Sequence, residues 1–106
     1  MSIRYEIKRW TDGEIIFSAE TESLKECVEL AVKNGVSLSY ADLRSADLQC
    51  ANLHRADLQS ANLQDAKLRG AWLFLANLGG AVLQGANLVG TNLQDVKLTG
   101  PILDGT

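Results

Sequence analysis

A leucine recurs at every fifth position through the last two thirds of this 106-residue chain. The run is unbroken over fourteen repeats, so the period must reflect structure rather than chance. A small residue stands two positions before each leucine and is alanine in ten repeats, while Asp or Asn directly precedes the leucine in eight. The leucines are Leu38, Leu43, Leu48, Leu53, Leu58, Leu63, Leu68, Leu73, Leu78, Leu83, Leu88, Leu93, Leu98 and Leu103.

A period of five fits neither a helix nor a straight strand, because both would spread the leucines over several faces. The chain must therefore turn once per repeat. Alternation along each short side points Ala and Leu inward, and it points the Asp or Asn and the residue after Leu outward. Glycine often fills the fifth position, where a type II turn requires positive φ. Earlier repeats have Ser45, Cys50, Arg55, Ser60 and Asp65 there, which predicts a different turn at those corners.

These repeats, of the form A(D/N)LxG, resemble the pentapeptide-repeat family from Val36 to Gly105. The resemblance implies a β-solenoid, specifically a right-handed quadrilateral β-helix with four repeats per coil. It gives about 3.5 coils here, stacked about 4.8 Å apart by backbone hydrogen bonds. A continuous leucine ladder then forms the core, and no single repeat folds alone.

The first thirty-five residues differ from the repeats. Alternation over 3–8, a turn signal at Trp10–Gly13 and a second strand pattern from Glu14 predict a β-hairpin. Ser23 and Glu26 form a capping-box pattern, and Asn34–Gly35 predicts the end of a helix of about ten residues. We therefore expect two parts: an N-terminal hairpin and helix over 1–35, capping the solenoid over 36–106. The alternative is that 1–35 forms a separate binding module, although it is too short for a good core of its own.

Composition narrows the classes of function. A formal net charge of −3 supplies no basic stripe for phosphates, so direct nucleic-acid binding is not expected. No apolar run approaches a membrane span, and the first ten residues lack a signal-peptide core, so we expect a soluble cytoplasmic protein. Cys27 and Cys50 are the only cysteines and lack metal-ligand spacing, so neither a disulfide nor a metal or cofactor site is predicted.

No group of residues predicts catalysis or a small-molecule substrate. Cys50 and His54 are close in sequence, but they lie on either side of an expected corner and have no third orienting group. The outward carboxylates of Asp42, Asp47 and Asp57 are typical of a cation site, yet the repeat pattern explains them as solvated residues between buried ones. We therefore predict that the protein is not an enzyme.

Departures from the repeat are the best signal of a binding surface. Large apolar residues occupy several positions that the pattern assigns to the exterior. We expect Trp72 and Phe74 to flank Leu73 on one side, and Ile102 to stack above Val82 on the next, as parts of one exposed patch. The opposite interpretation is that the hairpin folds over some of them. The predicted protein interface comprises Trp72, Phe74, Leu75, Val82, Val89 and Ile102.

The C-terminal repeats predict a second contact. They run to Thr106 without a capping helix, so a leucine core and strand edges lie open to water. Two-fold stacking of two C-terminal coils would close both cores, and such dimers are known in the family that these repeats resemble. A homodimer through the C-terminal coil is predicted.

The predicted function is a non-enzymatic protein-interaction or scaffold module with an unidentified protein partner. The alternative, suggested by the resemblance, is a DNA mimic that modulates or protects DNA gyrase. Its weakness is charge, because residues from 36 onward carry six acids and five bases, whereas duplex DNA has about one charge per 1.7 Å.

Overall fold

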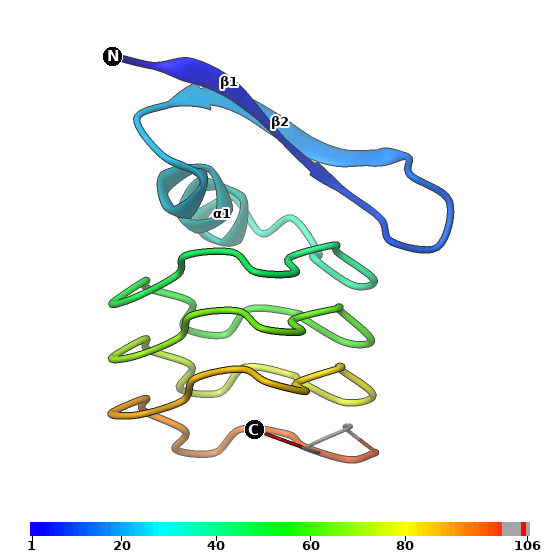
Figure 1. Cartoon of the computed structure of the whole chain (residues 1–106), viewed down its shortest axis with the longest axis vertical. Helices are drawn as coiled ribbons and strands as arrows, with labels where there is room; N and C mark the ends of the chain where they lie inside the picture. Colours follow the sequence, from blue (N-terminus) through cyan, green and yellow to red (C-terminus); the bar gives the residue numbers. More distant parts are fainter. Residues whose placement is uncertain (101–104, 106) are drawn as a thin grey trace.

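The computed structural model describes residues 1–100 and 105, and it consists of a capping segment followed by a stack of coils (Figure 1). The named elements are strand β1 (Ile3–Lys8), strand β2 (Ile15–Thr21) and helix α1 (Leu24–Lys33). The coils follow from residue 36 onward. No helix in the described part of the chain is long and apolar enough to cross a membrane.

The predicted hairpin is confirmed. β1 and β2 pair antiparallel, with Ile3 opposite Thr21 and Ile7 opposite Phe17. Its loop is closed by Arg9, whose guanidinium donates to both carboxylate oxygens of Asp12 at 2.8 to 3.1 Å. These hydrogen bonds lower the pKa of the Asp12 carboxyl below its ordinary value.

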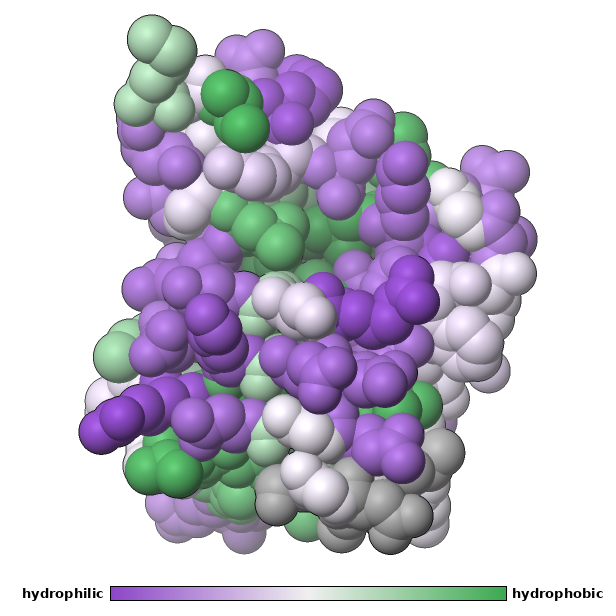
Figure 2. Space-filling model, in the orientation of Figure 1, coloured by the Kyte–Doolittle hydropathy of each residue, from purple (hydrophilic) through white to green (hydrophobic). Residues whose placement is uncertain are grey.

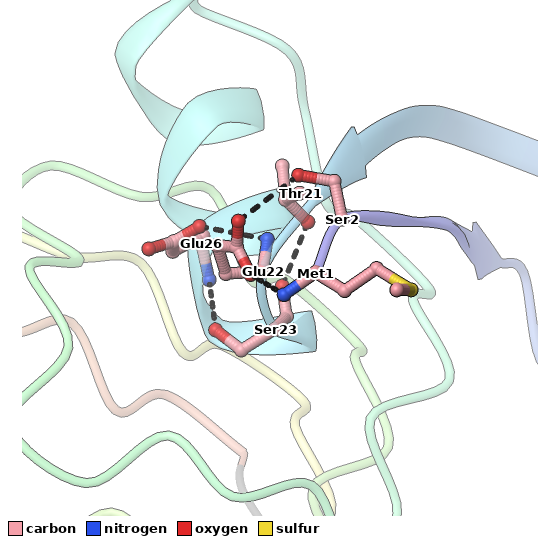
Figure 3. A network of polar contacts seen from close by, with 6 residues as sticks. All are labelled: Met1, Ser2, Thr21, Glu22, Ser23 and Glu26. Atoms are coloured by element: carbon pink, nitrogen blue, oxygen red, sulfur yellow. Dashed lines mark hydrogen bonds and ion pairs between the residues drawn. The ribbon is translucent and has the colours of Figure 1, made fainter.

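The predicted helix is also confirmed, together with both of its ends (Figure 3). The Ser23 hydroxyl accepts the backbone N–H of Glu26 at 3.2 Å, and the Glu26 carboxylate accepts the N–H of Glu22 at 2.9 Å. Asn34 is the C-cap, and Gly35 follows with a φ of 73° that glycine adopts without strain.

Residues twenty positions apart lie side by side in the coils. Parallel bridges join Asn52 to Trp72 and Trp72 to Asn92, and the same spacing recurs on the other sides. The Trp72 N–H donates to the Ala51 carbonyl at 2.9 Å, while the Trp72 carbonyl accepts the Leu53 N–H at 2.8 Å. Twenty residues per coil correspond to four repeats, so each coil has four sides and the chain is a β-solenoid.

The core is the predicted ladder of leucines and alanines. Every ladder leucine from Leu38 to Leu83, at the spacing of five, is at most 2% exposed, and every alanine from Ala41 to Ala86 is buried. Burial weakens in the last described coil, where Leu93 and Leu98 are 38% and 39% exposed. The small slot holds alanine because it lies beside a corner, where little space separates adjacent sides.

The prediction of a different turn at the non-glycine corners is wrong. Every fifth residue from Tyr40 to Gly100 has positive φ, and the non-glycine residues among them have values of 56° to 65°. In the corners from Tyr40 to Asp95 the leucine carbonyl accepts the N–H three residues later, as from Ala46 to Leu43 at 3.1 Å. Stacked coils must turn at the same points, so the non-glycine residues accept a strain of about 1 to 2 kcal/mol each.

The N-terminal segment closes the first coil. Helix α1 lies across it, and the buried side chains of Ile7, Val28 and Ala31 join the leucine ladder in one core (Figure 1). Main-chain donors at this edge are also satisfied, because the Glu29 carboxylate accepts the Asn52 N–H at 2.7 Å. The Lys8 carbonyl accepts another such donor, the N–H of Asp42, at 2.7 Å. This end of the sheet-like stack therefore offers few free edges for pairing.

Candidate protein-interaction surface

The Asp and Asn residues before the leucines have a structural role that the sequence analysis missed. Each side-chain oxygen accepts the backbone N–H two residues ahead, at 2.9 to 3.3 Å. Such Asx contacts satisfy a donor that points away from the ladder. The eight residues that do this are Asp42, Asp47, Asn52, Asp57, Asn62, Asn77, Asn87 and Asn92.

These contacts give the outward carboxylates a structural explanation. Asp42 also forms an ion pair with Arg44 at 2.8 Å, and hydrogen bonding from that guanidinium lowers the pKa of the Asp42 carboxyl. Within residues 1–100 and 105, no three His, Cys, Asp or Glu side chains gather in a way that would hold a metal ion.

Trp72 departs from this pattern and is conspicuously exposed. It occupies an Asx position, has no side-chain acceptor to offer the Phe74 N–H, and leaves 57% of its surface in solvent. Asn52 lies one coil earlier and Asn92 one coil later in the same column, and both make the Asx contact. Local structure therefore favours asparagine over tryptophan at position 72.

Phe74 and Leu75 continue this departure along the same rung. The Phe74 ring is half-buried and packs on the ring of His54, one coil earlier in the chain, with the ring centroids 5.0 Å apart. Leu75 turns the corner with a φ of 60° while 39% exposed. An exposed leucine in a strained conformation is unfavourable on both counts, which points to a role outside folding. We call Trp72, Phe74 and Leu75 the aromatic face.

The corner at Leu75 is also unusual in its stacking. In the other three corner columns glycine takes over in the later coils, where Gly70, Gly80 and Gly85 follow Cys50, Ser60 and Asp65. The side chain before each of these glycines leans toward it, and the Cys50 sulfur is 3.2 Å from the Cβ position of Gly70. At this corner Arg55, Leu75 and Asp95 succeed one another with no glycine. This column therefore presents side chains in every coil.

The structure does not bring all the predicted interface residues onto one patch. Val82 is ten residues from Trp72, which is half a coil, so it lies on the opposite side and not on the next one. Val82 is half-buried there, paired with Asn62 of the preceding coil. Val89 is 61% exposed but belongs to the side before that of Trp72, and Ile102 lies outside the described residues. The prediction that Val82 lies on the side next to Trp72 is therefore wrong, because two repeats of five residues separate them around a four-sided coil.

A second apolar region lies on the last described coil. Leu93 and Leu98 are exposed there, and Leu88 and Val96 are half-buried. Figure 2 shows that most of the visible face is polar, and that apolar groups appear over the C-terminal coils and in the recess between the hairpin and the first coil.

Leu75 yields a prediction that separates this corner from the core. Leu75→Asn should change the free energy of unfolding by no more than about 1 kcal/mol, because asparagine tolerates positive φ and offsets the lost apolar contact. The same substitution at Leu73, two residues away and fully buried, should prevent folding. Urea denaturation followed by circular dichroism measures both, and a large loss of stability in Leu75→Asn would show that this leucine serves the fold.

A stack of four-sided coils with one apolar, aromatic side defines a β-solenoid. Comparison with family models matches residues 37–73 and 76–106 to pentapeptide repeats, in eight copies. The chain belongs to the pentapeptide-repeat family. The match omits only Phe74 and Leu75 between its two segments, which are two of the three residues of the aromatic face.

Solved structures of the same family are similar to this chain. A pentapeptide-repeat protein (Rfr23) from the cyanobacterium Cyanothece 51142 is 44% identical, with a TM-score of 0.58, over 59% of this chain and 44% of that one. One from the Arabidopsis thaliana thylakoid lumen is 33% identical over 61% and 48%, with a TM-score of 0.35. One from Nostoc PCC 7120 is 32% identical over 66% and 72%, with a TM-score of 0.33. The chain thus spans less than half the length of the first two. No curated protein matched significantly.

Proposed function

We propose that this chain is a non-enzymatic protein-interaction module whose coils hold the aromatic face rigidly toward a protein partner. The observation that carries the proposal is Trp72, which is 57% exposed at a position where the repeat itself favours asparagine. Tryptophan is enriched among the residues that dominate binding energy at protein interfaces. The proposal takes 1–35 as a cap, 36–106 as a right-handed four-sided solenoid, and the cytoplasm as its location.

Rigidity supports this role. The backbone of Trp72 is hydrogen bonded in both directions, to Ala51 and from Leu53, and the Phe74 carbonyl accepts the Arg55 N–H at 2.9 Å. The Phe74 ring is further held by the ring of His54. A side chain already held in place loses little conformational entropy on binding, so more of its contact energy appears as affinity.

Self-association is the second part of the proposal. Leu93 and Leu98 are core residues by sequence but more than a third exposed, and a second copy stacked on the last coil would bury them. The charge balance of the coils offers no specific support for the alternative of a DNA mimic.

The test of the interaction role compares matched asparagine substitutions. Proteins retained by the immobilised wild-type chain are identified by mass spectrometry, and the affinity of each is then measured against Trp72→Asn and Val82→Asn. Both variants restore the Asx pattern and should stay folded, with stability within about 1 kcal/mol of the wild type. At least one partner should bind Trp72→Asn about thirtyfold more weakly, the size expected of a dominant interface residue. It should bind Val82→Asn, on the opposite side, normally. Partners that bind all three alike would contradict the proposal.

The dimer is tested independently by sedimentation. We expect the chain to sediment as a dimer at micromolar concentration, and Leu93→Asp combined with Leu98→Asp to sediment as a folded monomer. Both leucines are already open to solvent, so the charges cost little in the monomer and are buried only in the dimer. A monomeric wild type would refute the dimer without affecting the aromatic face.

A further inference from the structure

The ion pairs of the described residues all lie away from the aromatic face. Within residues 1–100 and 105, those pairs are Met1–Glu22, Arg4–Glu20, Lys8–Glu6, Arg9–Asp12 and Arg44–Asp42. Four belong to the N-terminal segment, and the last lies on the side opposite Trp72. The remaining surface cations of the coils are therefore available to a partner.

Two of these cations border the aromatic face. Arg55 is exposed at the same corner as Leu75, one coil earlier in the chain. Arg69 is exposed three residues before Trp72, just across the corner at Gly70. Within the described residues, neither guanidinium has an ion pair or a side-chain hydrogen bond; their backbone groups are used by the ladder. The apolar residues thus have an unpaired arginine next to two of their edges.

The acids close to this face leave the balance positive on the side toward the cap. The acids on that side are Glu29, whose carboxylate accepts the Asn52 N–H at 2.7 Å, and Asp57, whose carboxylate accepts the Ser37 hydroxyl at 2.7 Å. Arg55, Arg69 and Lys33, which lines a recess with Asn52 and His54, outnumber them. Asp95 lies at the same corner one coil later than Leu75, so Leu75 separates it from Arg55. The charge complement of this surface is therefore a partner with carboxylates placed toward Arg55 and Arg69, away from Asp95.

We infer that the aromatic face binds an acidic segment of a partner protein, one with an aromatic or aliphatic residue next to Asp or Glu. The inference rests on the proposed function and names the chemistry of its partner. The apolar residue would cover Trp72 and Leu75, and carboxylates would pair with the arginines, whose planar guanidinium donates two hydrogen bonds to a carboxylate. Arginine is also one of the residue types enriched among the residues that dominate binding energy at interfaces.

Single-stranded nucleic acid is the other anionic ligand with stacking groups, and the observations favour it less. Such binding uses a positive groove with several free aromatic platforms. Here the net charge is −3, and the Phe74 ring is already packed on His54, so within the aromatic face only Trp72 offers a free ring.

The experiment selects peptides from a random library on the wild-type chain and removes those that also bind Trp72→Asn. Affinities of the enriched peptides are measured in a Trp10→Phe background, where Trp72 is the only tryptophan and its fluorescence reports the site. We expect an excess of Asp and Glu beside an apolar residue, with binding that weakens as salt increases. Arg55→Glu combined with Arg69→Glu should reduce affinity about tenfold or more. Arg4→Glu, on the hairpin, should leave affinity unchanged.

Each other outcome overturns the inference. Enriched peptides that are neutral or basic, or that tolerate the double charge reversal, would refute the acidic partner while leaving the aromatic face as a binding site. Oligothymidylate that changes Trp72 fluorescence more strongly than the peptides would assign the face to nucleic acid. Selection of no peptide that distinguishes the wild type from Trp72→Asn would refute this class of ligand. The proposed function is judged separately, by its own partner measurements.

Discussion

Leu68→Asp is expected to leave the chain unfolded. Leu68 is fully buried between Leu48 and Leu88 in the middle of the stack. The substitution removes about 1.5 to 3 kcal/mol of apolar burial and places an unpaired carboxylate in the core, which costs several kcal/mol more. Since small proteins are stable by only about 5 to 15 kcal/mol, and neighbouring coils cannot fold separately, the loss should spread through the stack.

The matched control for this variant is Lys67→Asp, one residue earlier and exposed. It introduces the same side chain but points it into water, where the Asx contact becomes possible. Circular dichroism and size-exclusion chromatography should show an expanded, unstructured Leu68→Asp and a native Lys67→Asp. A folded Leu68→Asp would mean that the leucine ladder is not the source of stability.

Ala71→Leu is the second large effect that we expect. Ala71 is fully buried beside the corner at Gly70, and its column consists of Ala51, Ala71 and Thr91. Three extra carbon atoms have no space in this slot without displacing a neighbouring side chain or coil. Overpacking of this kind costs about 1 to 3 kcal/mol, and the regular spacing of the coils favours the upper end.

Thr91→Leu tests the same column where it is open. Thr91 is half-buried in the last described coil, and its hydroxyl donates to the Leu68 carbonyl at 3.0 Å. A leucine there can extend toward solvent, so the free energy of unfolding should change by only about 1 kcal/mol, mainly through the lost hydrogen bond. Equal losses in Ala71→Leu and Thr91→Leu, measured by urea denaturation, would contradict the argument from limited space.

The aromatic face and the last coil serve two separate contacts in this proposal. Trp72 lies in the middle of the stack, whereas Leu93 and Leu98 lie at its C-terminal end. A dimer formed at that end therefore leaves Trp72 accessible, and it would present the aromatic face twice. Two linked copies of a binding face raise the apparent affinity for a partner with two matching segments.

The candidate site was only partly predictable. The outward direction of Trp72 and Phe74 followed from alternation, and Leu75 was recognised as a departure at a corner. The four repeats per coil that the resemblance implies already separate Val82 from Trp72 by two sides, so the placement of Val82 on the next side was an error of position, which the bridge from Asn62 to Val82 corrects. The Asx contacts were missed although Asp and Asn are the residues that make them, since their frequency was attributed to solvation alone.

What the sequence determined by itself was the period, and with it which residues are inside. A buried leucine every fifth residue admits one kind of backbone, because only a chain that turns in every repeat keeps Leu38 to Leu83 on a common interior. The tertiary structure alone decided the geometry between coils. It imposed positive φ on Ser45 and Leu75 as well as on glycine, because stacked coils share hydrogen bonds and must turn together. It also placed Arg55 next to Leu75 in the adjacent coil, since residues that stack on each other in this fold are separated by twenty positions and no local pattern encodes that distance.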